Sequence, residues 1–139
     1  MKCFILSAVL LSIAMFRCED EIEPFCRCTV VLIGDNKIIE EYEIPVNLPH
    51  DDCDDHGCGE KCRVAVNKWT NNGDLNAKPE ELSGLSVGDF GCKLFGMDIE
   101  NAHARIYATA CNQPNKILTF FNFKQKFCCR NGKHEDKCA

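Results

Sequence analysis

The chain has 139 residues, a formal net charge of −5 at neutral pH and twelve cysteines. We expect no nucleic-acid partner for so acidic a chain, because nucleic acids and anionic membranes both attract a basic protein surface. The length is typical of one domain with its own apolar core.

The first eighteen residues have the three parts of a secretory signal peptide. Lys2 provides a basic start, residues 3–16 form an apolar run without an acidic side chain, and an acidic segment begins at Glu19. This run is too short to span a membrane. We therefore expect residues 1–18 to be removed and residues 19–139 to form a single secreted domain, and a buried N-terminal helix is the alternative. Two basic residues leave with the signal, so the net charge falls from −5 to −7.

Cleavage after Cys18 also removes Cys3 and Cys18 and leaves an even number of cysteines. An even number in a short exported chain predicts a disulfide framework, here of five bridges, whose connectivity stays open. A domain of this size can fold without bridges, so five of them favour persistence in a protease-rich or dehydrating fluid. The remaining cysteines are Cys26, Cys28, Cys53, Cys58, Cys62, Cys92, Cys111, Cys128, Cys129 and Cys138.

The first expected element of the mature chain is a β-hairpin. Residues 25–33 and 38–44 are rich in β-branched side chains and flank a Gly-Asp-Asn-Lys connection, which is typical of two paired strands. Cys26 and Cys28 are two residues apart on the first strand, so they point to the same face and can bridge two different partners above it.

A helix is expected over residues 59–69. The segment contains no proline, and its apolar side chains recur at helical spacing until an Asn-Asn-Gly sequence ends it. Cys58 and Cys62 are one helical turn apart and can face the core together. Pro45 and Pro49 are expected to end the preceding strand and to leave an extended link.

The second half of the chain is expected to add three strands. Residues 74–89 lack periodicity and predict a surface excursion, with one helical turn at 79–82. A strand is expected at 89–95, and two stronger candidates follow at 104–111 and 116–123.

The polar tail is expected to be tied down by its cysteines. Cys128 and Cys129 are neighbours on an extended chain and point to opposite faces, so each is expected to bridge a separate element.

The segment between the hairpin and the helix is the sharpest candidate for chemistry. It contains His50-Asp51-Asp52-Cys53, and secreted phospholipases A2 use a His-Asp-x-Cys motif in which the histidine is the general base and the aspartate holds calcium. The cysteine pair and the glycine-rich calcium loop that precede the phospholipase motif are missing here, and Pro49 favours a loop over the phospholipase helix. The phospholipase hypothesis is therefore a minor alternative.

Calcium binding is the second hypothesis for this segment. An EF-hand loop that starts at Asp52 has the required glycine at position 6 but has Arg63 in place of the bidentate glutamate at position 12. The weak calcium candidates that remain are Asp51, Asp52, Asp54 and Asp55.

Zinc is the third hypothesis, with Cys53, Cys58, Cys62 and a neighbouring histidine as ligands. Oxidation of the thiols in an exported protein counts against it. A cysteine nucleophile needs an unpaired thiol, and the even count leaves none. We therefore predict that the cysteines fasten a solvated loop to a helix, and we predict no cofactor and no enzyme activity.

Short motifs with cysteines follow one another in a recognisable order. They are Cys26-x-Cys28, Glu60-Lys-Cys62, residues 102–111, residues 127–133 and Lys137-Cys138. In this order they resemble the insect secreted family named after a follicle cell protein of the 3C type. The resemblance implies a small exported disulfide protein made by the egg-surrounding epithelium or by glands, without catalytic residues. Residues 71–91 and the aspartate-rich loop depart from the family pattern.

The sequence therefore predicts a small disulfide-rich α+β domain, in which an antiparallel sheet carries one main helix. We expect an extracellular structural or matrix protein of the eggshell type, with no membrane span. A salivary or venom effector that binds a host protein is the alternative, and a calcium-dependent lipid hydrolase is a third. The expected partner is another protein.

Overall fold

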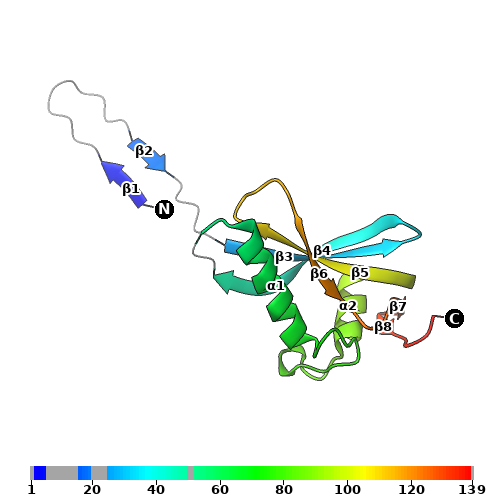
Figure 1. Ribbon diagram of the computed structural model, residues 1–139. Helices are drawn as coiled ribbons and strands as arrows, with labels where there is room; N and C mark the ends of the chain where they lie inside the picture. The colour runs from blue at the N-terminus through cyan, green and yellow to red at the C-terminus, as the bar shows by residue number, and fades with distance from the viewer. Residues whose placement is uncertain (1, 6–15, 20–24, 50–51, 139) are drawn as a thin grey trace, which may run out of the picture.

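The computed structural model describes residues 2–5, 16–19, 25–49 and 52–138 (Figure 1). A twisted antiparallel sheet forms one layer, and the helices lie against one of its faces. The expectation of a small disulfide-rich α+β domain is confirmed.

Two short N-terminal strands form a separate antiparallel pair. They are β1 (Lys2–Ile5) and β2 (Phe16–Glu19), and Figure 1 draws them apart from the larger sheet. Most of the expected signal peptide lies outside the described residues, so its removal stays a prediction.

The expected hairpin is confirmed as β3 (Phe25–Gly34) and β4 (Lys37–Pro49). The two residues between the strands, Asp35 and Asn36, have φ angles of 49° and 60°. A two-residue hairpin turn requires positive φ at both positions, and Asp and Asn tolerate this conformation better than other residues with a side chain.

The expectation that Pro45 ends the second strand is wrong, because β4 continues to Pro49 and Leu48 pairs with Cys26. The register shifts between Cys26 and Cys28, so the pairing resumes after an irregularity. β4 is an edge strand of the sheet. A proline is tolerated there because its missing N–H can face away from the ladder.

The centre of the sheet is β5 (Ile99–Ala110), which pairs with β3 along one side. Along its other side β5 pairs with β6 (Ile117–Asn122) and with β7 (Phe127–Arg130), and β8 (Lys133–His134) continues the order. The two strands expected after residue 104 are confirmed.

The expected main helix is confirmed as α1 (Asp55–Trp69) and begins four residues earlier than predicted. The Asp54 carboxylate accepts a hydrogen bond from the backbone N–H of Gly57 at 2.7 Å. This N-cap satisfies a free amide of the first turn and so extends the helix toward its N-terminus.

A strand expected at residues 89–95 is wrong, because this segment belongs to a second helix, α2 (Val87–Phe95). The Ser86 hydroxyl accepts a hydrogen bond from the backbone N–H of Asp89 at 3.0 Å, and Gly96 ends the helix with a φ of 64°. Ser86 is therefore a typical N-cap residue and Gly96 a typical C-cap residue. The buried side of α2 consists of Val87, Gly88, Gly91, Cys92 and Phe95.

The connection between α1 and α2 contains the expected helical turn, here a 3₁₀ turn at Glu80–Leu82. It is more than a surface excursion, because Leu75 is fully buried and Leu82 is 8% exposed. The backbone N–H of Leu75 also donates to the Gln125 side chain at 2.9 Å.

The core lies between the helices and the sheet face that carries Cys28, Val30 and Leu32. The residues between these on the strands point away from the helices, and we call this side of the sheet the outer face. There Thr29 pairs with Tyr107, and Val31 pairs with Arg105.

All ten cysteines from Cys26 onward are joined in five disulfides. Two of these bridges connect β3 to α1, one connects the loop before α1 to the end of β5, one connects α2 to β7, and one closes the tail. The pairs are Cys26–Cys58, Cys28–Cys62, Cys53–Cys111, Cys92–Cys129 and Cys128–Cys138. As expected, Cys128 and Cys129 bridge separate partners.

Candidate functional site

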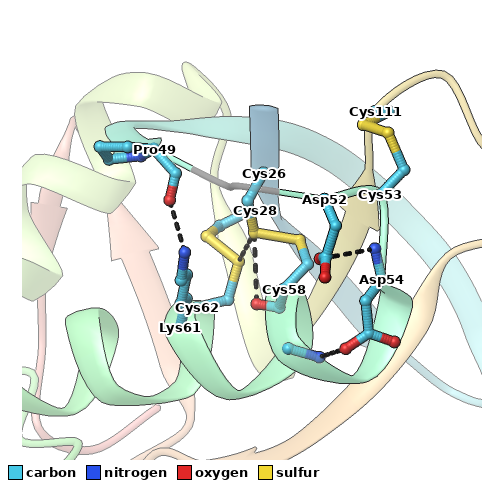
Figure 2. The surroundings of a disulfide bond; sticks show 11 residues. Cys26, Cys28, Pro49, Asp52, Cys53, Asp54, Cys58, Lys61, Cys62 and Cys111 are labelled. Carbon is cyan, nitrogen blue, oxygen red and sulfur yellow. Dashed lines mark hydrogen bonds between the residues drawn. A yellow bond between two sulfur atoms is a disulfide. The ribbon is translucent and has the colours of Figure 1, made fainter. Parts of the chain in front are cut away.

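The cysteines of the candidate segment hold α1 against β3 (Figure 2). Cys26 and Cys28 share one face of the strand, and Cys58 and Cys62 are one turn apart on the helix, so two parallel bridges form. Cys28, Cys58 and Cys62 are fully buried. Sulfurs of both bridges come close enough to resemble a metal site. They are disulfide sulfurs, however, and zinc requires thiolates.

The third bridge fixes the start of the segment. Cys53 is bonded to Cys111 directly after β5, and the Lys61 ammonium donates to the Pro49 carbonyl at 2.7 Å (Figure 2). The proposed zinc ligands Cys53, Cys58 and Cys62 therefore belong to three different disulfides. This arrangement excludes the zinc hypothesis.

The aspartates of the segment act mainly in helix initiation. Asp54 caps α1, and the Asp52 carboxylate accepts from the backbone N–H of Asp54 at 3.2 Å (Figure 2). Asp55 lies in the first turn of α1, where the helix dipole favours a negative charge. Its half-buried carboxylate has one oxygen, Oδ1, without a hydrogen-bond partner among the described residues. Asp51 lies outside the described residues.

The EF-hand hypothesis does not fit this geometry. An EF-hand needs a twelve-residue loop, whereas the segment is helical from Asp55 and its last position, Arg63, is in the middle of α1. Arg63 instead forms an ion pair with Glu60 one turn earlier, with Nε 2.9 Å from Oε2. The hydrogen bond from Arg63 is the main cause that lowers the pKa of Glu60. The phospholipase motif depends on His50, which lies outside the described residues.

The structure reveals a different candidate on β6, which the sequence did not predict. Phe120 is 79% exposed and has a φ of 58°, while its neighbours Thr119 and Phe121 are both buried. A bulky residue at positive φ is a rare conformation. Phe120 therefore has a strained backbone, and its exposed aromatic side chain projects between two buried neighbours.

Phe120 lies within a bulge of β6. Tyr107 is paired with Leu118 and Arg105 with Asn122, so β6 uses four residues where β5 uses two. The Thr119 hydroxyl donates to the Ile106 carbonyl at 2.9 Å and fixes one side of the bulge. Bulges redirect side chains and are frequent at functional sites.

Phe120 lies beside a hollow of about 340 Å³ between β6 and α1. Gly59 leaves space in its wall, because a Cβ added there meets nothing within 4 Å. We call this region the Phe120 surface. It consists of His56, Gly59, Glu60, Arg63, Leu118 and Phe120.

One sequence signal pointed toward this surface. Phe120 and Phe121 are adjacent in a predicted strand, and adjacent strand residues face opposite sides. One of the two phenylalanines is therefore expected to face away from the core, although the pairing of β6 with β5 decides which one.

Neither helix in the described part of the chain is long and apolar enough to cross a membrane. No protein-family model, curated protein or solved structure matches the chain. The assignment of a function therefore depends on the residues themselves.

Proposed function

We propose that the chain is an exported protein that acts by binding another protein and not by catalysis. The five disulfides support the extracellular part of this proposal, because such bridges form and persist in oxidising compartments. The observation that carries the binding role is the exposed, strained Phe120 beside its hollow.

The energetic cost of Phe120 supports a binding role. A residue in such a backbone conformation costs about 1–3 kcal/mol. Burial of a phenylalanine side chain would return about 1.5–3 kcal/mol, but in the isolated chain Phe120 is 79% exposed and gains little of it. A partner that covers the ring would supply this burial. Aromatic side chains are among the residues that contribute most to protein–protein binding.

Two biological settings are compatible with this activity. A secreted effector from a salivary or venom gland would use the Phe120 surface to hold a host protein, and the exposed aromatic favours this setting. A matrix component of the eggshell type is the second candidate, and the dense bridging supports it. Kinship with the follicle-cell-protein family stays a prediction.

Binding can be tested with the secreted protein immobilised on beads and exposed to extracellular fluid from the tissue in which it acts. We expect wild type and an Ile38→Ser control, which changes another apolar residue that is 67% exposed, to retain the same protein. Phe120→Ser should lose it. Retention by all three variants would contradict the proposal.

The absence of catalysis needs a separate test. Phospholipid hydrolysis with calcium should be at background for wild type and for His50→Ala. Turnover by wild type that disappears in His50→Ala would overturn the non-enzymatic part of the proposal and support the calcium-dependent lipid hydrolase.

A further inference from the structure

A second hollow, of about 510 Å³, lies at one end of the outer face. Three segments distant in sequence surround it: the β3–β4 turn, the first half of β5 and the connection from β6 to β7. Its volume is within the range of about 300–1,000 Å³ usual for small-ligand sites. It shares no residue with the Phe120 surface.

Arg105 distinguishes this hollow electrostatically. Every other arginine from Arg27 onward is paired with a carboxylate: Arg27 with Glu43, Arg63 with Glu60, and Arg130 with Glu100 and Glu135. The side chain of Arg105 has no hydrogen bond or ion pair within the described part of the chain, and the same holds for the side chains of Lys126 and His103. Three basic side chains without an ion pair to any described residue thus line one hollow of an acidic protein.

The negative charges of the hollow limit the ligand to about one anionic group. Asp35 and Glu100 also line the wall. Glu100 is partly neutralised by Arg130, whose Nη2 lies 3.7 Å from its Oε1. The two positive charges of Arg105 and Lys126 therefore exceed the one remaining negative charge, that of Asp35, by one. A polyanion would in addition be repelled by the net charge of −5.

Amide side chains complete the wall. Asn36, Asn101 and Asn122 line the hollow, and the amides of Asn36 and Asn101 form no side-chain hydrogen bond with any described residue. Each amide offers both donors and an acceptor. Sugar hydroxyls likewise both donate and accept, so such amides suit a saccharide better than a simple anion.

The connection between β6 and β7 is held in place by hydrogen bonds to the connection between α1 and α2. The Gln125 side chain accepts from the Leu75 backbone at 2.9 Å and donates to the Asp74 carboxylate at 2.7 Å. Gln125 therefore holds in place the backbone segment that carries Asn122 and Lys126. A backbone that is already ordered lowers the entropic cost of binding.

We propose that this hollow binds an acidic saccharide, that is, a sugar unit with one carboxylate or sulfate group. The acidic group contacts Arg105 and Lys126, and the hydroxyls contact the asparagine amides. The planar guanidinium of Arg105 matches the two oxygens of a carboxylate or sulfate. This site is separate from the protein-binding role of Phe120 and does not depend on it.

The test is an NMR titration of the ¹⁵N-labelled secreted protein with glucuronate, glucose 6-sulfate and neutral glucose, and with acetate and inorganic sulfate. We expect saturable shifts for the two acidic sugars, at amides in residues 35–36, 100–105 and 122–126. Arg105→Gln and Lys126→Gln should each weaken binding about tenfold or more, as expected for loss of a charged hydrogen bond. Arg63→Gln, on α1 and outside the lining of this hollow, should bind like wild type.

Several outcomes would overturn the proposal. One is the lack of saturable shifts with either acidic sugar, and another is equal binding of glucose. Equal binding of acetate or sulfate alone would show that the sugar contributes nothing to binding. Shifts only at other residues would show that the ligand binds elsewhere. An Arg105→Gln variant that keeps its wild-type spectrum and full affinity would also contradict it. Because Arg105 lies beside Val31 on the outer face, the Lys126→Gln variant keeps the test decisive if Arg105→Gln misfolds.

Discussion

The sulfurs of Cys26 and Cys62 lie 3.7 Å apart although the two residues belong to different disulfides. This proximity follows from two parallel bridges between the same strand and the same helix. The loops that these bridges close are nearly identical, with sequence separations of 32 and 34 residues. The second bridge therefore restricts the unfolded chain little beyond what the first already does.

We predict that the two parallel bridges stabilise the protein non-additively. A single loop of this length is worth about 4 kcal/mol in the chain-entropy model. Removal of Cys28–Cys62 by paired alanine substitution should cost less than removal of Cys92–Cys129, whose separation is 37 residues. Removal of both parallel bridges should cost more than the sum of the separate losses. Urea denaturation of the variants measures this, and additive losses would contradict the prediction.

The adjacent residues Phe120 and Phe121 provide a matched pair for stability. Phe120→Gly should change the free energy of unfolding by less than about 1 kcal/mol, because glycine relieves the positive φ and little burial is lost. Phe121 is 6% exposed, so Phe121→Ala should cost about 3–5 kcal/mol. Chemical denaturation measures both. A large loss in Phe120→Gly would mean that the ring stabilises the isolated chain, which contradicts our account.

Two helical glycines should respond in opposite directions to alanine. Gly59→Ala in α1 meets no atom within 4 Å and should raise the free energy of unfolding by about 0.5–1 kcal/mol. Gly91→Ala in α2 would place a Cβ 2.7 Å from Cε1 of Phe127 and should lower it by about 1–3 kcal/mol. Phe127 cannot easily move, since Phe95 and Phe123 pack against its ring. Thermal unfolding of both variants checks the sign of each change.

Asp54 separates helix capping from calcium binding. Asp54→Ala should lower stability by about 0.5–2 kcal/mol without calcium, whereas Asp54→Asn should retain most of it. Added calcium should leave both differences unchanged in denaturation experiments. A loss that arises only when calcium is present would instead support a calcium site in this loop.

Asp74 should make the fold sensitive to acid. The hydrogen bond from the Asn76 backbone is the largest cause that lowers the pKa of Asp74, and the hydrogen bond from the Gln125 side chain is the next largest. A lowered pKa in the folded state adds stability above the usual value of about 3.9, and this stability is lost as the pH falls through the folded-state value. The urea midpoint of wild type should therefore drop between about pH 5 and pH 2, and less so in Asp74→Asn. Glu81→Gln removes a carboxylate without a hydrogen bond to any described residue and should behave like wild type.

Local sequence patterns were sufficient for much of the fold. The hairpin and α1 were predicted because turn residues and helical spacing are local signals. The strand predicted in place of α2 was an error, although Ser86, Asp89 and Gly96 mark the ends of this helix in the sequence itself. The continuation of β4 past Pro45 was missed because it depends on the strand being outermost in the sheet.

The candidate sites could not be predicted from local patterns. The exposure of Phe120 and its place within a bulge depend on how β6 packs and pairs with β5. The hollow around Arg105 joins segments from three parts of the chain. The pairing of Cys26 with Cys58, and not with Cys62, depends on the position of α1 along β3. Each of these features is a property of tertiary contacts.

The bridges between β3 and α1 also affect the order of events during synthesis. Cys26 and Cys28 emerge from the ribosome first, and their partners follow 32 and 34 residues later. The other cysteines synthesised before Cys58 are Cys3, Cys18 and Cys53. None of them is the native partner of Cys26 or Cys28. Any bond formed early must be broken by thiol exchange once the helix has been made. This exchange takes seconds to hours and depends on oxidant and isomerase. We therefore expect the yield of native protein to rise with the disulfide isomerase activity of the producing cell.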